Sequence, residues 1–473
     1  MWQQFTLSGM QVGRWRASSY IYHLVGLLQT WQKGSWLLPW GDAIGAGLVV
    51  ITLVLSPFVS TTLIGVLAMA IALWWCLITL ADETSTGKEG VNTATPIHLV
   101  ILLYWFISLI ATALSPVKMA ALVGLSRLSL YLVAFVMMAR VLRSSKIRSI
   151  LIAIYLHISL VVSVYGIRQW FAGVKPLATW VDADSPLKNV TRVYSYLENP
   201  NLLAAYLVPA IALSLAAIFV WQRWLPKLLA VTIFGVNSIC LILTYSRGGW
   251  IGFIVCIFTF MALVGFWYSY KLPTAWRALA IPVLLGGAGF IFLAGVVFVP
   301  TLRDRILSMF LGREDSSNNF RLNVWGSVVK MIRDRPILGI GPGNSAFNLV
   351  YPLYQQTKFT ALSAYSILLE IAVETGLVGL SCFFWFLIIT FNQGFSQLNR
   401  YRLQLNTNGF WLAGAIAGMA GMLAHGLVDT VWYRPQVSML WWFLVAIITS
   451  YYTWQPVPQG DDDQTDQKLF PMN

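Results

Sequence analysis

The chain alternates between long apolar runs and short polar stretches. The apolar runs are about 17–22 residues long, enough for a helix to cross the hydrocarbon core of a bilayer. This pattern predicts an all-α polytopic membrane protein with about twelve transmembrane helices, the tenth of them split. The predicted spans are residues 42–58, 61–80, 96–114, 120–141, 149–167, 202–221, 228–245, 249–269, 278–298, 367–391, 409–428 and 436–453.

Composition supports the membrane class. Of the 473 residues, 58% are hydrophobic and only 10% are charged, whereas soluble domains carry about a quarter charged residues. The net charge of +13 is explained by basic loops beside the spans, so we do not expect nucleic-acid binding. The four cysteines lie inside apolar runs and lack metal-ligand spacing, so we expect no disulfide framework, metal site or cofactor.

The basic residues also predict the orientation, because short cytoplasmic loops are enriched in lysine and arginine. Loops on one side carry Arg143, Lys146, Arg148, Arg223, Lys227, Lys271, Arg277, Arg400 and Arg402, and those on the other side are poor in basic residues. Both termini are therefore expected in the cytoplasm. The expected divisions are a cytoplasmic or interfacial segment 1–40, nine spans in 41–298 with an outer loop at 168–201, a large outer loop 299–366 containing short helices, three spans in 367–453, and an acidic tail 454–473.

The N-terminal segment has an apolar helical face, which predicts an interfacial helix rather than a cleavable signal peptide. The residues on this face are Ile21, Leu24, Val25, Leu28 and Trp31.

The stretch 299–379 is the longest polar interruption and is rich in arginine. Residues 319–332 predict an amphipathic helix, with Leu322, Trp325, Val328, Val329 and Ile332 on its apolar stripe and Arg321 off it. A glycine-rich loop follows, including Gly341 and Gly343, and then an apolar helix with Glu370 and Glu374 one turn apart. This combination predicts a site for an anionic substrate.

Two further polar stretches lie at predicted outer boundaries. One runs from Arg192 to Asn201, and the other is the short connection that contains Arg247. An arginine so close to the membrane is costly unless it is partnered or functional; the alternative is an interfacial anchor.

Several residues have plain structural explanations. Glu370 and Glu374 are expected to cap a helix or pair with a loop arginine, with a general base as the alternative. The glycine loop is either a simple turn or a nest of amides for a phosphate. His425 and Asp429, at i and i+4, are expected to form a structural hydrogen-bonded pair, and Arg127, inside span four, requires a partner that the sequence does not identify.

As a set, the motifs resemble the O-antigen ligase and polymerase (Wzy_C-like) superfamily of membrane proteins. They cover roughly residues 190–440. The matching elements are Asn199 to Asn201, Thr244 to Gly248, Arg321 with Trp325, Pro336 to Gly343, and Glu374 to Gly379.

The resemblance has one departure, because Tyr365 and Ser366 stand where ligases of this family carry a His-Asn pair. In that stretch the chain looks like the cyanobacterial branch called IctB, which is named for bicarbonate transport. The resemblance therefore implies two functions of different classes.

In the first, the protein sits in the bacterial inner membrane and transfers a glycan from a polyprenyl-pyrophosphate carrier at the outer leaflet, without a metal. Arg192, Asn201, Arg247, Arg321, Gly341 and Gly343 would bind the substrate, and Glu370, Glu374 and Tyr365 would be catalytic. In the second, the protein transports a small anion such as bicarbonate, or assists its accumulation.

Overall fold

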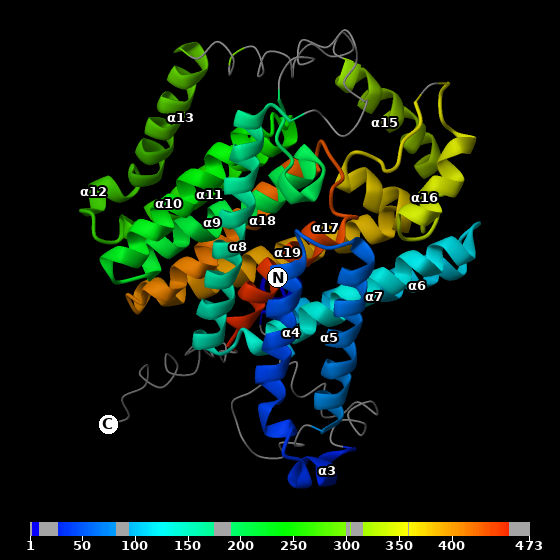
Figure 1. The fold of residues 1–473 in the computed structure, drawn as a ribbon, viewed down its shortest axis with the longest axis horizontal. Helices are drawn as coiled ribbons and strands as arrows, with labels where there is room; N and C mark the ends of the chain where they lie inside the picture. Colours follow the sequence, from blue (N-terminus) through cyan, green and yellow to red (C-terminus); the bar gives the residue numbers. More distant parts are fainter. Residues whose placement is uncertain are drawn as a thin grey trace, which may run out of the picture.

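A computed structural model of the protein describes residues 2–8, 27–81, 94–174, 191–298, 303, 316–357 and 359–453. These residues form helices and connecting loops, with no strand among them (Figure 1). Eleven of the helices in this part are long and apolar enough to cross a membrane. The shorter helix α19 has 16 residues, all of them buried. The predicted all-α, multi-pass membrane fold is confirmed.

Each predicted span coincides with one helix. The long helices are α4 (Gly41–Leu55), α5 (Thr61–Ala81), α6 (Pro96–Ala113), α7 (Lys118–Val141), α8 (Ser145–Ala172), α9 (Pro200–Val220), α10 (Trp224–Leu243), α11 (Arg247–Ser269), α13 (Ala280–Phe298), α17 (Ile367–Leu403), α18 (Phe410–Gly426) and α19 (Pro435–Ser450). The helices outside the predicted spans are α1 (Trp2–Phe5), α3 (Gln29–Gly34), η2 (Leu38–Trp40), η3 (Ser195–Leu197), α12 (Thr274–Arg277), α15 (Ser316–Asp334), α16 (Asn344–Val350), η5 (Tyr351–Leu353) and η6 (Thr407–Gly409).

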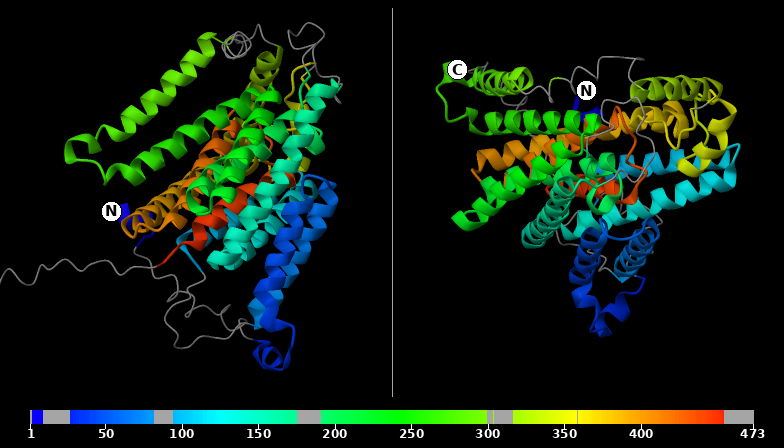
Figure 2. Two further views of the ribbon diagram at one scale, coloured as in Figure 1. Left: turned by 60° about the vertical axis from the view of Figure 1, so that its left-hand side comes forward. Right: turned by 45° about the horizontal axis from the view of Figure 1, so that its top comes forward.

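Helices α9, α18 and α19 form the centre of the bundle. In Figure 2 the orange and red ribbons of α18 and α19 run between the green helices and the cyan and blue ones. Helix α18 packs against α9, α11, α17 and α19. Small residues allow the closest crossing, because a Cβ atom added to Gly252 of α11 would lie 2.7 Å from the backbone oxygen of Gly421 in α18, as is typical of membrane helix pairs.

One end of the bundle carries most of the polar connections, and we call it the polar end. It comprises residues 191–199, 244–246, 316–366 and 427–434. Helix α15 packs against α17, and α16 packs against α7, so this segment covers that end of the bundle (Figure 1).

The predicted amphipathic helix is present as α15, but its buried stripe differs from the prediction. Val324, Val328 and Met331 face inward and pack with Phe347 and Tyr351 in a second, smaller core. Of the predicted stripe, Val328 is buried and Ile332 packs against this core, whereas Leu322, Trp325 and Val329 are half-buried.

Helix α17 is split at Gly376, as the sequence pattern predicted. Gly376 has φ 69° and ψ −172°, an extended conformation that only glycine adopts readily. The loop that follows Pro336 fills the gap. The amides of Ile340 and Gly341 donate to the carbonyls of Val373 and Glu374, and those of Leu377 and Val378 donate to the carbonyls of Pro336 and Ile337. These four hydrogen bonds pair backbone groups on both sides of the break within the protein, as a membrane interior requires.

Some predicted features lie outside the described residues. These are the acidic tail after Thr453, residues 175–190 of the loop 168–201, all of 299–315 except residue 303 in the large loop 299–366, and Ile21, Leu24 and Val25 of the interfacial helix. The end of that helix is described as α3. The membrane orientation stays a prediction.

Candidate functional site

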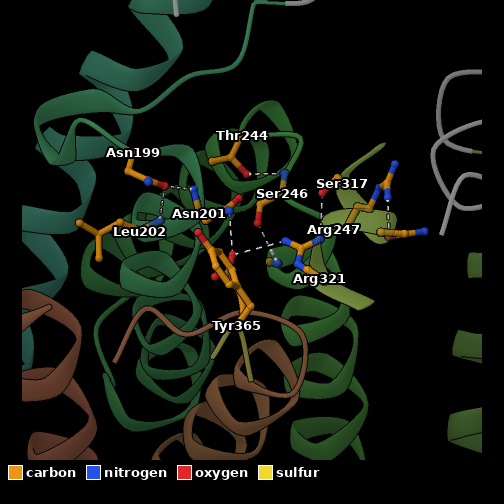
Figure 3. A network of polar contacts seen from close by, with 12 residues as sticks. Asn199, Asn201, Leu202, Thr244, Ser246, Arg247, Ser317, Arg321 and Tyr365 are labelled. Atoms are coloured by element: carbon orange, nitrogen blue, oxygen red, sulfur yellow. Dashed lines mark hydrogen bonds and ion pairs between the residues drawn. The ribbon is translucent and has the colours of Figure 1, made fainter. Parts of the chain in front are cut away.

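The first turn of α9 places Asn201 at the polar end. Asn199 is the N-cap residue, and its side-chain oxygen accepts the amides of Asn201 and Leu202, satisfying donors that a helix start leaves free. Pro200 occupies the first helical position, where its missing N–H costs nothing. The Asn-Pro-Asn element thus fixes the helix start and leaves the Asn201 side chain available (Figure 3).

Arg192 is held between this turn and the α10–α11 connection. Its Nε donates to the backbone oxygen of Thr244 at 3.0 Å, and its Nη2 donates to Oδ1 of Asn201 at 3.2 Å. The pKa of Arg192 is lowered to about 10, mainly by burial; Asp429 opposes this shift, and the positive charges of Arg321 and Arg247 add to it. Arg192 is therefore still charged at neutral pH.

Asp429 lies at the centre of these contacts. Its Oδ2 accepts a hydrogen bond from Nδ2 of Asn201 at 2.7 Å and lies 3.7 Å from Nη2 of Arg321. Its side chain is only 6% exposed, and that of Arg321 is 16% exposed. This carboxylate connects Arg192, through Asn201, with Arg321.

The remaining arginine is anchored on α15. Nη1 of Arg247 donates to Oδ1 of Asn318 at 2.9 Å, and Nη1 of Arg321 donates to Oγ of Ser317 at 3.1 Å (Figure 3). The three predicted arginines thus come together from the loop before α9, the first residue of α11 and the N-terminal part of α15. We call Arg192, Arg247 and Arg321, with Asn201 and Asp429, the arginine cluster. With three cations and one carboxylate it has a formal charge of +2.

The expected hydrogen bond between His425 and Asp429 is not formed. His425 is 1% exposed, and neither of its ring nitrogens has a hydrogen-bond partner within the described residues. Helix α18 ends at Gly426, so Asp429 is not one helical turn beyond His425; it points to Asn201 instead. From the sequence, Asp429 was expected only to form a structural hydrogen bond with His425.

Tyr365 lies beside the arginine cluster, just before α17. It has a left-handed backbone, with φ 51°, and its carbonyl accepts the indole N–H of Trp325 at 3.4 Å. Burial raises the pKa of its phenol, as do the nearby Asp429, Tyr433 and Glu370, while Arg321 opposes them. The phenol therefore stays protonated and is a hydrogen-bond donor rather than a base.

Glu370 and Glu374 line a cavity of about 170 Å³ next to the arginine cluster. We call it the carboxylate cavity. Oε2 of Glu370 accepts the amide of Ala364 at 2.7 Å. Neither glutamate forms an ion pair with an arginine of the described chain, which is contrary to the expected loop pairing. Arg127 lines the same cavity, so the structure places the arginine of span four in the same cavity as the two glutamates.

The glycine loop packs against helices rather than forming a phosphate nest. The amides of Gly339, Ile340 and Gly341 donate to the carbonyls of Arg335, Val373 and Glu374, so they are not available to a ligand. A Cβ atom at Gly341 would lie 2.5 Å from that of Ala121, and one at Gly343 would lie 2.6 Å from Cα of Gly124. Both glycines allow the loop to approach α7, and a substrate-binding role for them stays a prediction.

Among the described residues, no group of three or more His, Cys, Asp or Glu side chains is arranged to hold a metal ion. The charged and acidic side chains gathered at the polar end are arginines, carboxylates and a phenol.

Residues 232–384 match the family model described as O-antigen ligase. This segment, about a third of the chain, is similar to O-antigen ligases. The match includes Arg247, Arg321, Tyr365, Glu370 and Glu374 and supports the resemblance found in the sequence. The other members of the arginine cluster, Arg192, Asn201 and Asp429, lie outside the matched part, yet they bond to one another and to residues inside it. No curated protein matches the chain.

Proposed function

We propose that this protein is a membrane glycan transferase of the O-antigen ligase type. It would take a glycan from a polyprenyl-pyrophosphate carrier at the outer leaflet of the bacterial inner membrane and pass it to a hydroxyl group of an acceptor. The observation that carries this proposal is the arginine cluster, a buried site with a formal charge of +2 beside a cavity with two carboxylates.

The cluster suits a pyrophosphate leaving group. When the bond between the sugar and the pyrophosphate breaks, negative charge develops on the phosphate oxygens, and fixed cations stabilise that charge. Guanidinium groups pair with phosphate oxygens in a bidentate way. Because Arg321 and Arg192 are largely buried, their charges are less screened by water than surface charges are.

The neighbouring carboxylate supplies the base. The acceptor oxygen would attack the anomeric carbon as the bond from that carbon to the pyrophosphate oxygen breaks, and the bond electrons leave with the pyrophosphate. The hydroxyl proton would pass to Glu370, which lines the carboxylate cavity. Tyr365, next to both sites, would donate a hydrogen bond to a pyrophosphate oxygen. Asp429 would be the counter-ion of the cluster when no pyrophosphate is bound.

Bicarbonate transport is the competing function. It is favoured by the presence of Arg127, Glu370 and Glu374 in helices α7 and α17, since ionisable groups within spans often mark ion pathways. A transporter must give the anion a path through the bilayer at least transiently, whereas a transferase need only hold it at one surface.

Two measurements on purified protein separate these functions. We expect a short-chain polyprenyl pyrophosphate to bind, and Arg247→Ala to weaken that binding about tenfold or more, because a hydrogen bond to a charged group contributes about 1.5–3 kcal/mol. In liposomes we expect no bicarbonate uptake above that of empty vesicles, with or without a sodium gradient. Saturable bicarbonate flux without polyprenyl pyrophosphate binding would reverse the assignment.

A further inference from the structure

The proposed roles of the arginines and carboxylates in glycan transfer do not explain why much of the wall of the carboxylate cavity is aromatic. Aromatic side chains from five segments line it: Tyr104, Tyr131, Phe386, Trp432, Trp441 and Trp442. The ring centroids of Trp432 and Trp441 are 4.1 Å apart, and those of Phe386 and Trp442 are 5.9 Å apart. Flat apolar faces of this kind bind the C–H faces of a ring-shaped ligand.

The few polar groups in the wall include hydrogen-bond acceptors as well as hydrogen-bond donors. Glu370 is 5% exposed, and its Oε1 accepts no hydrogen bond of normal geometry in the described part of the chain, although the Thr430 hydroxyl lies close to this carboxylate. A buried acceptor left without a partner costs about 1–3 kcal/mol, which a donor from a ligand would recover. On the donor side the wall has the Arg127 guanidinium and the hydroxyls of Thr430 and Ser438.

The presence of both donors and acceptors beside aromatic rings favours a sugar over an ammonium compound as the ligand. An ammonium compound would use the carboxylates and the aromatic faces, but Arg127 would repel it and the hydroxyl donors would gain nothing. A sugar has hydroxyls that both donate and accept around its edge and apolar C–H groups on its faces. The volume of about 170 Å³ is below that of pockets for drug-sized ligands, roughly 300–1,000 Å³, and suits one small ring.

We propose that the carboxylate cavity is a sugar subsite, separate from the arginine cluster, that holds the ring of the acceptor while its hydroxyl donates to Oε1 of Glu370. The role as acceptor subsite rests on the proposed function. The two sites adjoin, because Thr430 of the cavity wall follows Asp429 of the cluster in the chain and Tyr365 lies next to both. Donor and acceptor would therefore meet at the boundary between them.

The test uses the full chain in detergent with methyl β-glucoside as probe. Saturation-transfer-difference NMR should show saturation of the ring C–H protons, and excess inorganic pyrophosphate should not displace the glucoside. Glu370→Gln should weaken glucoside binding at least tenfold while leaving pyrophosphate binding intact. Glu198→Gln is the matched control, since this exposed carboxylate lies at the polar end but outside the cavity wall.

Two further variants keep the proposal testable if the glutamine variant unfolds. Trp432→Leu should reduce the saturation of the C–H protons, and Thr430→Val, which keeps the side-chain shape, should weaken binding by several-fold. The proposal is overturned if choline binds and the glucoside does not, if pyrophosphate displaces the glucoside, or if pyrophosphate binds and the glucoside fails to. Glucoside binding without any pyrophosphate binding would instead support the sugar subsite and refute the proposed transfer reaction.

Discussion

Replacing Asp429 by asparagine should lower the stability of the protein and at the same time raise its affinity for pyrophosphate. Asparagine keeps the shape of the side chain but removes the negative charge that lies 3.7 Å from Arg321. The arginine cluster would then have three positive charges and no carboxylate. The structure thus predicts effects of opposite sign on folding and on binding.

The magnitudes follow from the burial of the pair. Two unit charges about 4 Å apart interact with about 4 kcal/mol at an effective dielectric constant of 20, and breaking a buried pair costs about 3–5 kcal/mol. The contact between Arg321 and Asp429 is longer than a hydrogen bond, so we expect a loss of about 3 kcal/mol in the free energy of unfolding. For binding, removing a carboxylate about 8 Å from a phosphate charge relieves about 2 kcal/mol. With screening by water this electrostatic free energy falls to about 1 kcal/mol, which corresponds to an affinity for pyrophosphate about fivefold higher.

Unfolding monitored by tryptophan fluorescence would measure the first effect, and calorimetry with inorganic pyrophosphate the second. Asp334→Asn is the control, because Asp334 accepts a hydrogen bond from Tyr354 at an exposed position of α15 and should change neither quantity by more than about 0.5 kcal/mol. If Asp429→Asn weakened pyrophosphate binding, the carboxylate would not be competing with the ligand, and the assignment of the cluster as an anion site would be wrong.

Three other predictions concern the fold, the charge of the cluster and the orientation. Gly376→Ala should destabilise the protein by more than about 3 kcal/mol, since its Cβ would lie 2.1 Å from the oxygen of Ile337 at a φ that only glycine adopts readily. Gly326→Ala, at an exposed helical position with nothing within 4 Å, should be neutral or slightly stabilising in the same unfolding assay. The advantage of the wild-type protein over Arg192→Gln in pyrophosphate binding should shrink as the pH rises through the Arg192 pKa of about 10, because the guanidinium loses its charge there; comparing the two proteins cancels the ionisation of the ligand, and an advantage that already shrinks near pH 7 would point to another group. In a cysteine-free background, a cysteine at Gln356 should react with an impermeant thiol reagent in spheroplasts and one at Gln404 should not, whereas the reverse labelling would invert the predicted orientation.

The sequence located the spans because their apolar runs leave few alternatives in length or position. It also identified the three arginines, since each interrupts an apolar pattern at a span boundary, where a charged side chain is costly unless it has a partner or a function. Their mutual contacts were a hypothesis, because distances between the starts of α9, α11 and α15 depend on packing that no local pattern encodes.

Asp429 was given the wrong partner for a physical reason. Its spacing from His425 fits a helix, but α18 ends at Gly426, and the following turn directs the carboxylate toward α9. The signal that could have found its role is charge balance: a surplus of arginines at one boundary requires a nearby acid. The packing role of the glycine loop was not predicted, because the gap that it fills belongs to α17, which comes later in the chain.

The break in α17 has a consequence for the order of assembly. Isolated in a bilayer, the segment around Gly376 would have unpaired amides and carbonyls unless it formed a continuous helix. The open form is stable only after residues 336–341 have docked. We therefore expect this helix to insert uninterrupted and to open in a later step, so that docking of the loop is also the event that brings α15 and its arginine to their final place. A newly inserted chain would pass through a stage in which every span is in the bilayer but the anion site does not yet exist.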